Sequence, residues 1–410
     1  MASDSETPRS PTTESGRQET VFVLGTKPIG KLTTQEILKA KTDVFTPTPT
    51  ENLPYKSEET LFQSIRAFIV KHVELPADIY YDISASFVLA TWRVEQARSA
   101  TYLNPLAAHG SGKSTYDEIL QILCFKSVNS EGATRGAIIR IADGTNATLI
   151  LDESDNWLNP RDYDNPVAAV LNAGYRRRLI GGGVLLCEPK RNGEYAAVQR
   201  DSFGFKVISG RNPLNDVLAS RAITIRMRKT NRTFPKPDYA EAWMLRKQLL
   251  KYQENHADEP LEHPATERIG DGRLREIFEP LLAAAPNDEI RNHLIDFANE
   301  ELERRRKEEL MSVEAIVARV TVELADKDPT RSRILVKEIT DTVNADIPNP
   351  KEHVDSRYVG KLLKRLGLQG DHDREGNVIL VDRAQFDYLR ERYMPSTEKP
   401  KTLENILEAR

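Results

Sequence analysis

The pattern of apolar and polar residues predicts two helices at the start of the folded part of the chain. The first follows a loose capping signal from Ser57 and Thr60, and its apolar residues recur at helical spacing: Leu61, Ile65, Phe68, Ile69 and Val73. The second follows Pro76 with similar spacing: Tyr80, Ile83, Phe87, Trp92 and Val94. We expect residues 56–101 to form a helical lead-in. Residues 1–55 are rich in Ser, Thr, Pro and Glu, so we expect them to be largely disordered.

Between residues 102 and 235, short apolar runs alternate with helical patterns. This order is typical of a mainly parallel sheet covered by helices, so the predicted fold class is α/β. The expected strands are Leu103–Ala107, Thr148–Leu151, Phe205–Ser209 and Ala222–Arg226. The expected helices are Tyr116–Cys124, Arg135–Ile141 and Val167–Arg178. Two further strand-like runs flank Asn192 and Gly193, and they predict a β-hairpin whose tip carries Lys190 and Arg191.

A glycine-rich stretch joins the first expected strand to the first expected helix of this region. It reads Ala-Ala-His-Gly-Ser-Gly-Lys-Ser-Thr from Ala107 to Thr115. Glycines let backbone N–H groups converge on an anion at a helix N-terminus, which makes the stretch a candidate phosphate-binding loop. Lys113 is expected to bridge the β and γ phosphates, and Ser114 to hold Mg²⁺. The candidate nucleotide-binding residues are Gly110, Ser111, Gly112, Lys113, Ser114 and Thr115.

Ala107 stands where the full phosphate-loop pattern has a glycine, although the Gly-Lys-Ser core is complete. This departure could narrow the loop or alter the approach to it. His109 lies inside the loop, and we expect it to shape the loop or to contact a neighbouring residue.

A second candidate for the same site is the strand that ends in carboxylates. The apolar run from Thr148 to Leu151 is followed by Asp152 and Glu153, as expected for a buried parallel strand whose C-terminal end faces a ligand. Asp152 is expected to bind Mg²⁺ directly or through water, and Glu153 to polarise the attacking water. The alternative is that the two acids begin a solvated turn.

From residue 236 to residue 310 the pattern is helical, and we expect a helical lid and connector. Its apolar positions include Trp243, Leu245, Leu249, Leu274, Phe278 and Leu281. The stretch Glu300–Lys307 has acids ahead of bases at four-residue spacing. That spacing favours a salt-bridged, exposed helix over a nucleic-acid surface.

Residues 311–395 predict a separate small domain of three helices and a two-stranded wing, and residues 396–410 a tail. The helices are expected from Val313, over Val336–Val343 and over Ser356–Leu366, and a connector at 370–377 precedes the strand Val378–Val381. On the third helix Arg357, Lys361 and Lys364 form one stripe with Arg365. A basic helix face in a winged-helix domain could enter the major groove of DNA. A protein-docking domain with a solvated basic face is the alternative.

Composition limits the class of protein. A chain of 410 residues with 39% hydrophobic content can bury a core, and the net charge of −4 means that any nucleic-acid surface must be local. No apolar run has the length of a membrane span, so we expect a cytoplasmic protein without a membrane partner. Cys124 and Cys187 lie in apolar surroundings and are expected to be reduced core thiols. The histidines show no metal-ligand spacing, so a structural zinc is not expected.

The sequence resembles the AAA+ helicase module of the primase-helicase replication proteins of plasmids, phages and integrated mobile elements, over roughly residues 60–300 and the C-terminal winged-helix domain as well. The resemblance lies in Leu103–Pro105, Gly110–Ser114, Ile138–Arg140, Thr148–Glu153, Leu171–Arg177 and Leu218–Arg221. It implies an AAA+ P-loop ATPase core at residues 102–235 that uses ATP and Mg²⁺. No primase or polymerase module accompanies it.

The resemblance also implies roles for residues beyond the two motifs. Asn212 stands where AAA+ proteins carry the sensor residue that hydrogen-bonds the γ phosphate or the attacking water. Arg221 resembles the arginine finger that one subunit inserts into its neighbour's site, with a surface arginine at a strand edge as the alternative. A finger that acts in trans requires a homo-oligomer, which we expect to be a hexameric ring. Arg273 or Arg275 is a candidate second sensor, and a surface role is the alternative.

These expectations combine into a ring-forming, Mg-ATP-dependent DNA helicase or translocase that serves replication of a mobile element. Glu153, Arg221 and Asn212 are its expected catalytic residues, and the expected DNA-contacting residues are Lys190, Arg191, Arg357, Lys361 and Lys364. A single strand in the pore is the expected DNA partner, with duplex DNA at the winged helix. An origin-binding or helicase-loader ATPase is one alternative, and an AAA+ regulator that remodels protein partners is another.

Overall fold

The computed structural model describes residues 45–130, 134–156, 158, 165–178, 183–189, 195–345, 353–373 and 376–394. The chain divides into two compact units, residues 1–299 and 300–410. The division falls inside helix α10 (Asp288–Leu310), whereas the sequence placed a boundary after residue 310. Each unit is described by itself.

A five-stranded parallel sheet lies at the centre of the first unit, in the order β2-β3-β6-β1-β7. Its strands are β1 (Tyr102–Leu106), β2 (Val128–Asn129), β3 (Leu149–Leu151), β6 (Lys206–Ile208) and β7 (Ala222–Arg226). Tyr102 pairs with Lys206 and Ala222, and Leu149 pairs with Lys206. The C-terminal ends of β1, β3, β6 and β7 therefore lie along one side of the sheet, which we call its carboxyl edge. The predicted α/β class with a parallel sheet is confirmed.

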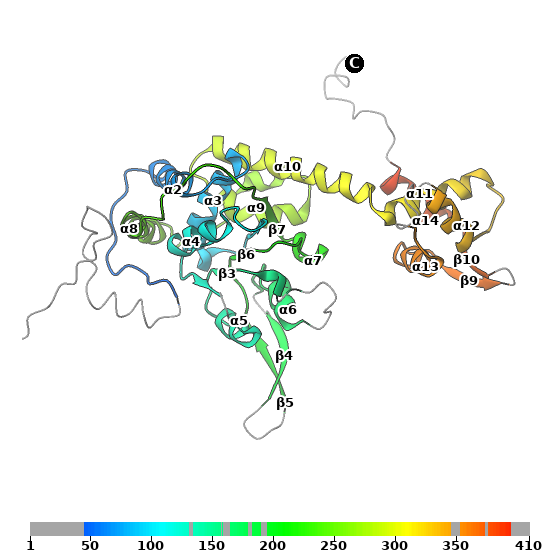
Figure 1. Cartoon of the computed structure of the whole chain (residues 1–410), viewed down its shortest axis with the longest axis horizontal. Helices are drawn as coiled ribbons and strands as arrows, with labels where there is room; N and C mark the ends of the chain where they lie inside the picture. Colours follow the sequence, from blue (N-terminus) through cyan, green and yellow to red (C-terminus); the bar gives the residue numbers. More distant parts are fainter. Residues whose placement is uncertain are drawn as a thin grey trace, which may run out of the picture. The chain divides into compact units, whose positions relative to one another are not determined.

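Helices cover both faces of this sheet (Figure 1). On one face lie α5 (Arg135–Ala142), α6 (Pro166–Ala173) and α7 (Asp216–Ala219), whose apolar residues share a core cluster with Tyr102, Leu149, Leu151 and Ile208. Side chains alternate across a strand, so Ile150 and Val207, both fully buried, point to the other face. There Phe87 of α3 packs edge-on against Phe205, with ring centroids 5.5 Å apart.

The helices on the second face come from distant parts of the sequence: α2 (Glu58–His72), α3 (Asp78–Trp92), α4 (Lys113–Leu123), α8 (Tyr239–Asn255) and α9 (Gly272–Ala284). α3 packs against α2, α8 and α9, and α4 packs against α2 and α8. α2 begins at the predicted cap, because Ser57 Oγ accepts the Thr60 N–H at 3.1 Å. The expected lead-in thus packs in one unit with the helices expected to form the lid.

One helix of the first unit is shorter than the sequence predicted. α6 begins at Pro166 after the cap Asn165 and ends at Ala173, whereas we expected it to reach Arg178. A Cβ at Gly174 would lie 2.2 Å from the Ser202 carbonyl oxygen. Any side chain at position 174 would therefore clash with this carbonyl, and only glycine fits there. Beyond it, the Arg177 N–H donates to the Arg98 carbonyl at 2.8 Å. The backbone after Gly174 therefore bonds to a distant segment in place of a further helical turn.

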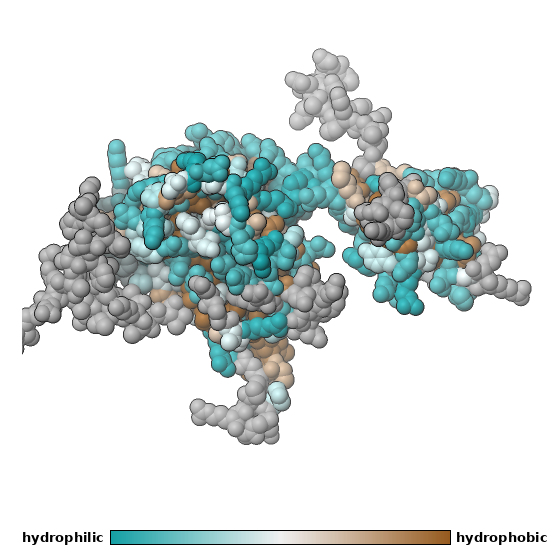
Figure 2. All heavy atoms as spheres, in the orientation of Figure 1, coloured by the Kyte–Doolittle hydropathy of each residue, from teal (hydrophilic) through white to brown (hydrophobic). Residues whose placement is uncertain are grey.

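The predicted β-hairpin is present as β4 (Val184–Pro189) and β5 (Tyr195–Arg200), which pair antiparallel up to Pro189 and Tyr195. It extends away from the sheet beside α6 (Figure 1). Leu185 and Tyr195 are 71% and 70% exposed, and apolar surface is visible along the hairpin (Figure 2). Cys187 is exposed on this hairpin, so the expectation that it is a core thiol is wrong. Cys124 is buried as expected, and burial raises the pKa of its thiol to about 12.

The described part of the second unit contains four further helices and a three-stranded sheet of order β8-β10-β9. Its elements are α11 (Val313–Lys327), β8 (Arg333–Leu335), α12 (Val336–Ala345), α13 (Ser356–Arg365), β9 (Gly370–Asp373), β10 (Gly376–Leu380) and α14 (Arg383–Tyr393). The three predicted helices and the strand near residue 378 are present. Residues 370–373 form a strand that pairs with β10, where we expected a connector. One apolar core joins the helices through Val317, Ile339, Leu362 and Leu389.

No helix in the described part of the chain combines the length and the apolar character that a membrane crossing requires.

Candidate nucleotide-binding site

The candidate phosphate loop connects the end of β1 to the start of α4. Gly110 and Gly112 have φ angles of +75° and +80°, in the left-handed region that glycine enters without steric cost. Gly112 immediately precedes Lys113, the first residue of α4, and its carbonyl accepts the Tyr116 N–H at 2.9 Å. The first N–H groups of α4 have no partner within the helix, and they point into the loop. This geometry suits the binding of phosphate groups.

Ala107 does not need to be a glycine in this loop. Its backbone lies outside the positive-φ region, and its N–H donates to the Gly210 carbonyl at 3.1 Å, which continues the pairing of β1. The side chain is 5% exposed. The methyl group of Ala107 is therefore part of the core at the start of the loop.

Lys113 and Asp152 bring the two sequence motifs together. The Lys113 Nζ lies 3.0 Å from Asp152 Oδ1, and the two side chains are 14% and 17% exposed. Lys113 is at the N-terminus of α4, and Asp152 follows the last residue of β3. An anion in the loop would compete with Asp152 for this lysine, and a divalent cation would compete with the lysine for Asp152. The pair thus holds both groups in place at the position where Mg-nucleotide is expected.

Glu153 has a strained backbone. Its φ is +53°, which is uncommon for a residue other than glycine, and its N–H donates to Asp152 Oδ1 at 2.7 Å. The side chain is exposed to solvent at the same edge of the sheet. Strain of this kind persists only where the surrounding structure enforces it, and such positions gather at functional sites.

Asp155 joins the acidic loop, residues 152–155 after β3, to the loop that carries Asn212. Its carboxylate accepts the N–H groups of Arg211 at 2.8 Å and Asn212 at 2.9 Å. Burial works against the ionised carboxyl, but these two N–H groups and the Arg211 guanidinium outweigh it and hold the pKa of Asp155 below its usual range. Gly210, before them, leaves no space for a side chain, since a Cβ there would lie 2.5 Å from Ser154 Oγ. Sequence reasoning did not identify Asp155.

The phosphate loop also contacts the Asn212 loop. The Gly210 N–H donates to the Pro105 carbonyl at 3.1 Å, and the Arg211 guanidinium donates to His109 Nε2 at 3.0 Å. His109 thus links the phosphate loop to the Asn212 loop. Because β6 lies between β1 and β3, the Asn212 loop stands between the phosphate loop and the acidic loop. Asn212 itself is exposed there.

A buried carboxyl lies beneath this site. Asp117, on α4, is 1% exposed, and its Oδ1 accepts a hydrogen bond from Ser209 Oγ at 2.6 Å. Its Oδ2 is buried without a hydrogen-bond partner. Burial raises the pKa of Asp117 to about 7 despite the bond from Ser209, and the charge of Asp152 raises it further while Lys113 opposes the shift. The sequence signal is a single acid among the apolar positions of a helix, beside Tyr116 and Leu120.

Arg221 lies at the N-terminal ends of the strands, whereas the phosphate loop lies at their C-terminal ends. It precedes Ala222, which pairs with Tyr102 at the start of β1, whereas the loop follows Leu106. With about 3.3 Å of rise per residue, the length of β7 separates the two edges by ~15 Å. The Arg221 guanidinium donates to the Val217 carbonyl and stacks 4.8 Å from the Tyr175 ring centroid. Arg221 is thus held on a surface that its own phosphate loop does not reach.

The two candidates for a second sensor are held away from the phosphate loop. Arg273 stacks 4.8 Å from the same Tyr175 ring and pairs with Glu276 at 2.8 Å. Arg275 donates to the Ile269 carbonyl at 2.6 Å and pairs with Glu267 at 2.8 Å. Among the described residues, neither forms a hydrogen bond or an ion pair with the phosphate loop, and their role as a second sensor stays a prediction.

The remaining predicted residues concern DNA. Lys190 and Arg191 lie outside the described residues, between the paired strands β4 and β5. Arg357, Lys361 and Lys364 are all exposed on α13, while Val359, Leu362 and Leu363 of the same helix are buried. Arg365 pairs with Glu314 at 3.2 Å. The described structure therefore contains the predicted basic stripe on one helix face of the second unit.

The residues of the site suit Mg-nucleotide in both geometry and chemistry. Glycines with positive φ, free helix N–H groups and a lysine meet a carboxylate at the carboxyl edge of a parallel sheet, where α/β proteins bind ligands. Lys113 and the loop N–H groups would hold phosphate, and the Ser114 hydroxyl with Asp152 would hold Mg²⁺. When bound, the ion would supply charge neutralisation for the phosphates.

No family profile matches the chain, and no curated protein matches it in sequence. The solved structure titled "SCCmec type IV Cch - active helicase" is 12% identical, covers 82% of this chain and 72% of that chain, and has a TM-score of 0.42. "The A form apo structure of NrS-1 C terminal region" is 11% identical, covers 83% of this chain and 78% of that chain, and has a TM-score of 0.32. The Aeropyrum pernix ORC1 protein in complex with DNA is 14% identical, covers 80% and 96%, and has a TM-score of 0.23. The geometry of the site, rather than these similarities, carries the functional proposal.

Proposed function

We propose that the first unit binds Mg-ATP and hydrolyses it. The observation that carries this proposal is that the phosphate loop, the acidic loop and the Asn212 loop are joined at one sheet edge by the Lys113–Asp152 ion pair and the Asp155 hydrogen bonds. An oxygen-rich anion, a divalent cation and a water molecule need a lysine, a carboxylate and a general base close together. This edge supplies all three.

In this proposal Lys113 binds the β and γ phosphates, and Ser114 and Asp152 hold Mg²⁺. Glu153 takes a proton from the attacking water, and Asn212 hydrogen-bonds the γ phosphate or that water. Gly110, Ser111, Gly112 and Thr115 form the rest of the cradle.

Two substitutions test the proposal. Lys113→Ala is expected to abolish binding of Mg-ATP, measured by titration calorimetry. Glu153→Gln is expected to keep that binding and to stop phosphate release, because it removes the base and leaves the cradle intact. Undiminished turnover in Glu153→Gln would remove Glu153 from the catalytic role, and undiminished binding in Lys113→Ala would refute the nucleotide site itself.

We further propose that the chain is an AAA+ ATPase that works as a ring, with Arg221 completing the site of a neighbouring subunit. The support is the position of Arg221 at the sheet edge opposite its own phosphate loop, where it is held by Val217 and Tyr175. In a closed ring with head-to-tail contacts, one edge of a subunit faces the other edge of the next. Helices α8 and α9 correspond to the lid in this proposal, and a hexamer is the expected ring.

The proposed work of the ring is DNA unwinding or translocation in the replication of a mobile element. The β4–β5 hairpin extends from the core, and its proposed tip residues Lys190 and Arg191 would contact single-stranded DNA phosphates. Changing both to Ala is expected to preserve basal ATPase activity and to remove stimulation by DNA and unwinding. Unwinding at the wild-type rate by this variant would refute DNA contact at the tip.

A second candidate function is that of an origin-binding or loading ATPase. The observation that favours it is the exposed basic stripe on α13, in a unit whose helices and β9–β10 pair suit a winged helix. Arg357→Ala with Lys361→Ala is expected to weaken duplex binding and to leave unwinding of a preformed fork intact in a helicase. A chain that binds duplex DNA through this stripe and does not unwind forks would be a loader.

A further inference from the structure

A cationic segment crosses the phosphate loop and was not identified from the sequence. It comprises residues 226–236, beginning at the last residue of β7, and reads Arg-Met-Arg-Lys-Thr-Asn-Arg-Thr-Phe-Pro-Lys, with five cations and no acid. We call it the basic strap. All of its cations are exposed: Arg226, Arg228, Lys229, Arg232 and Lys236. The strap begins at the sheet edge that carries the candidate site, because the C-terminal end of β7 lies beside that of β1.

The contacts of the strap fix its course. The Met227 N–H donates to the Leu106 carbonyl at 3.0 Å, one residue before the phosphate loop begins. Met227 Cε lies 3.7 Å from the position that a Cβ on Gly112 would occupy. The equivalent position on Gly110 lies 3.6 Å from Lys229 Cε and 4.0 Å from Lys229 Nζ. The start of the strap therefore runs along both glycines of the loop, with the Lys229 ammonium beside the first.

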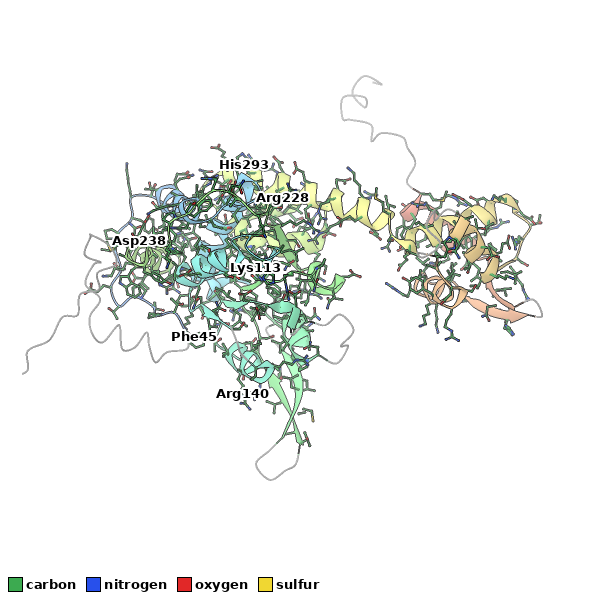
Figure 3. The ribbon with its side chains drawn as sticks, in the orientation of Figure 1. Phe45, Lys113, Arg140, Arg228, Asp238 and His293 are labelled. Carbon is green, nitrogen blue, oxygen red and sulfur yellow. The ribbon has the colours of Figure 1, made fainter. Side chains whose placement is uncertain are left out.

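The charge of Lys229 is not neutralised by the described parts of the chain. Lys229 has no hydrogen bond or ion pair with a described residue, whereas Lys113 is paired with Asp152 at 3.0 Å. Farther along the strap, Arg232 lies 3.9 Å from Glu74 and stacks 5.0 Å from the Phe234 ring centroid. Figure 3 labels Lys113 at the start of α4 and Arg228 on the strap. An unpaired ammonium beside glycines with positive φ, whose neighbouring N–H groups favour anions, is a second source of positive charge for the same ligand.

We propose that Lys229 is a second phosphate-binding lysine of this site, which contacts the phosphates of a bound nucleoside triphosphate from within the same chain as the loop. This inference rests on the proposed nucleotide site. In this inference Lys229 supplies a second positive charge to the phosphates from within the same chain. Arg273 and Arg275 pair with Glu276 and Glu267 instead. Nucleotide is favoured over a DNA backbone because the ammonium lies against the loop itself.

The test is the affinity of the full chain for Mg-ATP, measured by titration calorimetry, in Lys229→Ala and in the matched control Lys236→Ala. Lys236 is an exposed lysine of the same strap, without an ion pair among the described residues and farther from the loop in sequence. A charge-assisted hydrogen bond at a solvent-exposed position corresponds to about a tenfold change in affinity. Lys229→Ala is therefore expected to bind about tenfold more weakly, Lys229→Arg to recover most of the affinity, and Lys236→Ala to match the wild type.

The outcomes separate this inference from the proposed function. Wild-type affinity in Lys229→Ala, while Lys113→Ala does not bind, would overturn the role of Lys229 and leave the nucleotide site standing. A wild-type chain that does not bind Mg-ATP would overturn both. If Lys229→Ala keeps its nucleotide affinity but binds single-stranded DNA more weakly, with a salt dependence reduced by about one phosphate contact, the strap contacts DNA and the inference is wrong.

Discussion

Asp117→Asn is expected to change the pH dependence of stability of the first unit. Asp117 is 1% exposed, with one oxygen bonded to Ser209 and the other without a partner. Because burial raises its pKa to about 7, the folded state binds this proton more tightly than the unfolded state does. The contribution of the protonated carboxyl is fully present below about pH 4, and it is lost as the pH rises through about 7. Asparagine has nearly the same shape and no charge at any pH.

The size of the effect follows from the difference between a pKa of about 7 and the ordinary value near 3.9. At about 1.4 kcal/mol for each pH unit, that difference corresponds to a free energy of unfolding on the order of 4 kcal/mol for a fully buried group. Between about pH 5 and about pH 8.5 only the last two of these pH units apply, so the wild type should lose on the order of 3 kcal/mol relative to Asp117→Asn. Titrating groups that do not interact with Asp117 affect both proteins equally.

The assay is urea denaturation of the nucleotide-free chain at the two pH values, followed by tryptophan fluorescence. All three tryptophans of the chain, Trp92, Trp157 and Trp243, belong to residues 1–299, so the signal reports the first unit. Asp258→Asn, at an exposed aspartate of the same unit, is the control and should follow the wild type. Equal loss of stability in wild type and Asp117→Asn would show that Asp117 is ionised at ordinary cost, and the argument from its burial would fail.

Three further predictions concern the site and its support. Arg221→Ala should keep Mg-ATP binding and lose most of the turnover, roughly 10³-fold for an arginine finger. Mixing the Arg221→Ala protein with the Lys113→Ala protein should restore some activity. No recovery in proven mixed oligomers would argue against action across subunits. Asp155→Ala removes the acceptor of two backbone N–H groups. The free energy of unfolding of the first unit, measured by urea denaturation, should therefore fall by about 1–3 kcal/mol, and the chain should lose turnover. Unchanged turnover would contradict a role of Asp155 in holding Asn212. The pKa of His256 is raised, mainly by its hydrogen bond to Glu58 and against the effect of burial, so its stabilising contribution is present below the ordinary histidine pKa and is lost as the pH rises through the raised value. His256→Gln should therefore lower unfolding free energy at about pH 5.5 and have less effect above about pH 8, and a difference that grows with pH would reverse this assignment.

The sequence determined the features that depend on neighbours along the chain. The cap at Ser57, the glycines of the phosphate loop and the strand that ends just before Asp152 are local patterns, and each occurs where the pattern predicted it. Periodicity likewise placed the buried residues of α13 on one face and its basic residues on the other. A helix period or a left-handed glycine is fixed by a few consecutive residues, so one sequence is enough to predict it.

Where the predictions failed, a partner distant in sequence was responsible. The helix expected to reach Arg178 ends at Ala173 because Gly174 packs against Ser202. Cys187 lies in an apolar run but is exposed, because its strand belongs to a two-stranded hairpin outside the main sheet. Residues 370–373 pair with β10 although they read as a polar connector. Backbone hydrogen bonding and burial across the fold outweigh local propensity in all three cases.

Tertiary structure alone decided which residues surround the predicted motifs. The placement of β6 between β1 and β3 brings Asp155 to the backbone of Arg211 and Asn212, and Ser209 to Asp117. The pairing of β7 with β1 carries Lys229 to Gly110 and leaves Arg221 at the far edge. These contacts join segments tens of residues apart, and they follow from strand order. Strand order is set by how the apolar faces of the whole chain pack together, which no single stretch of the sequence encodes.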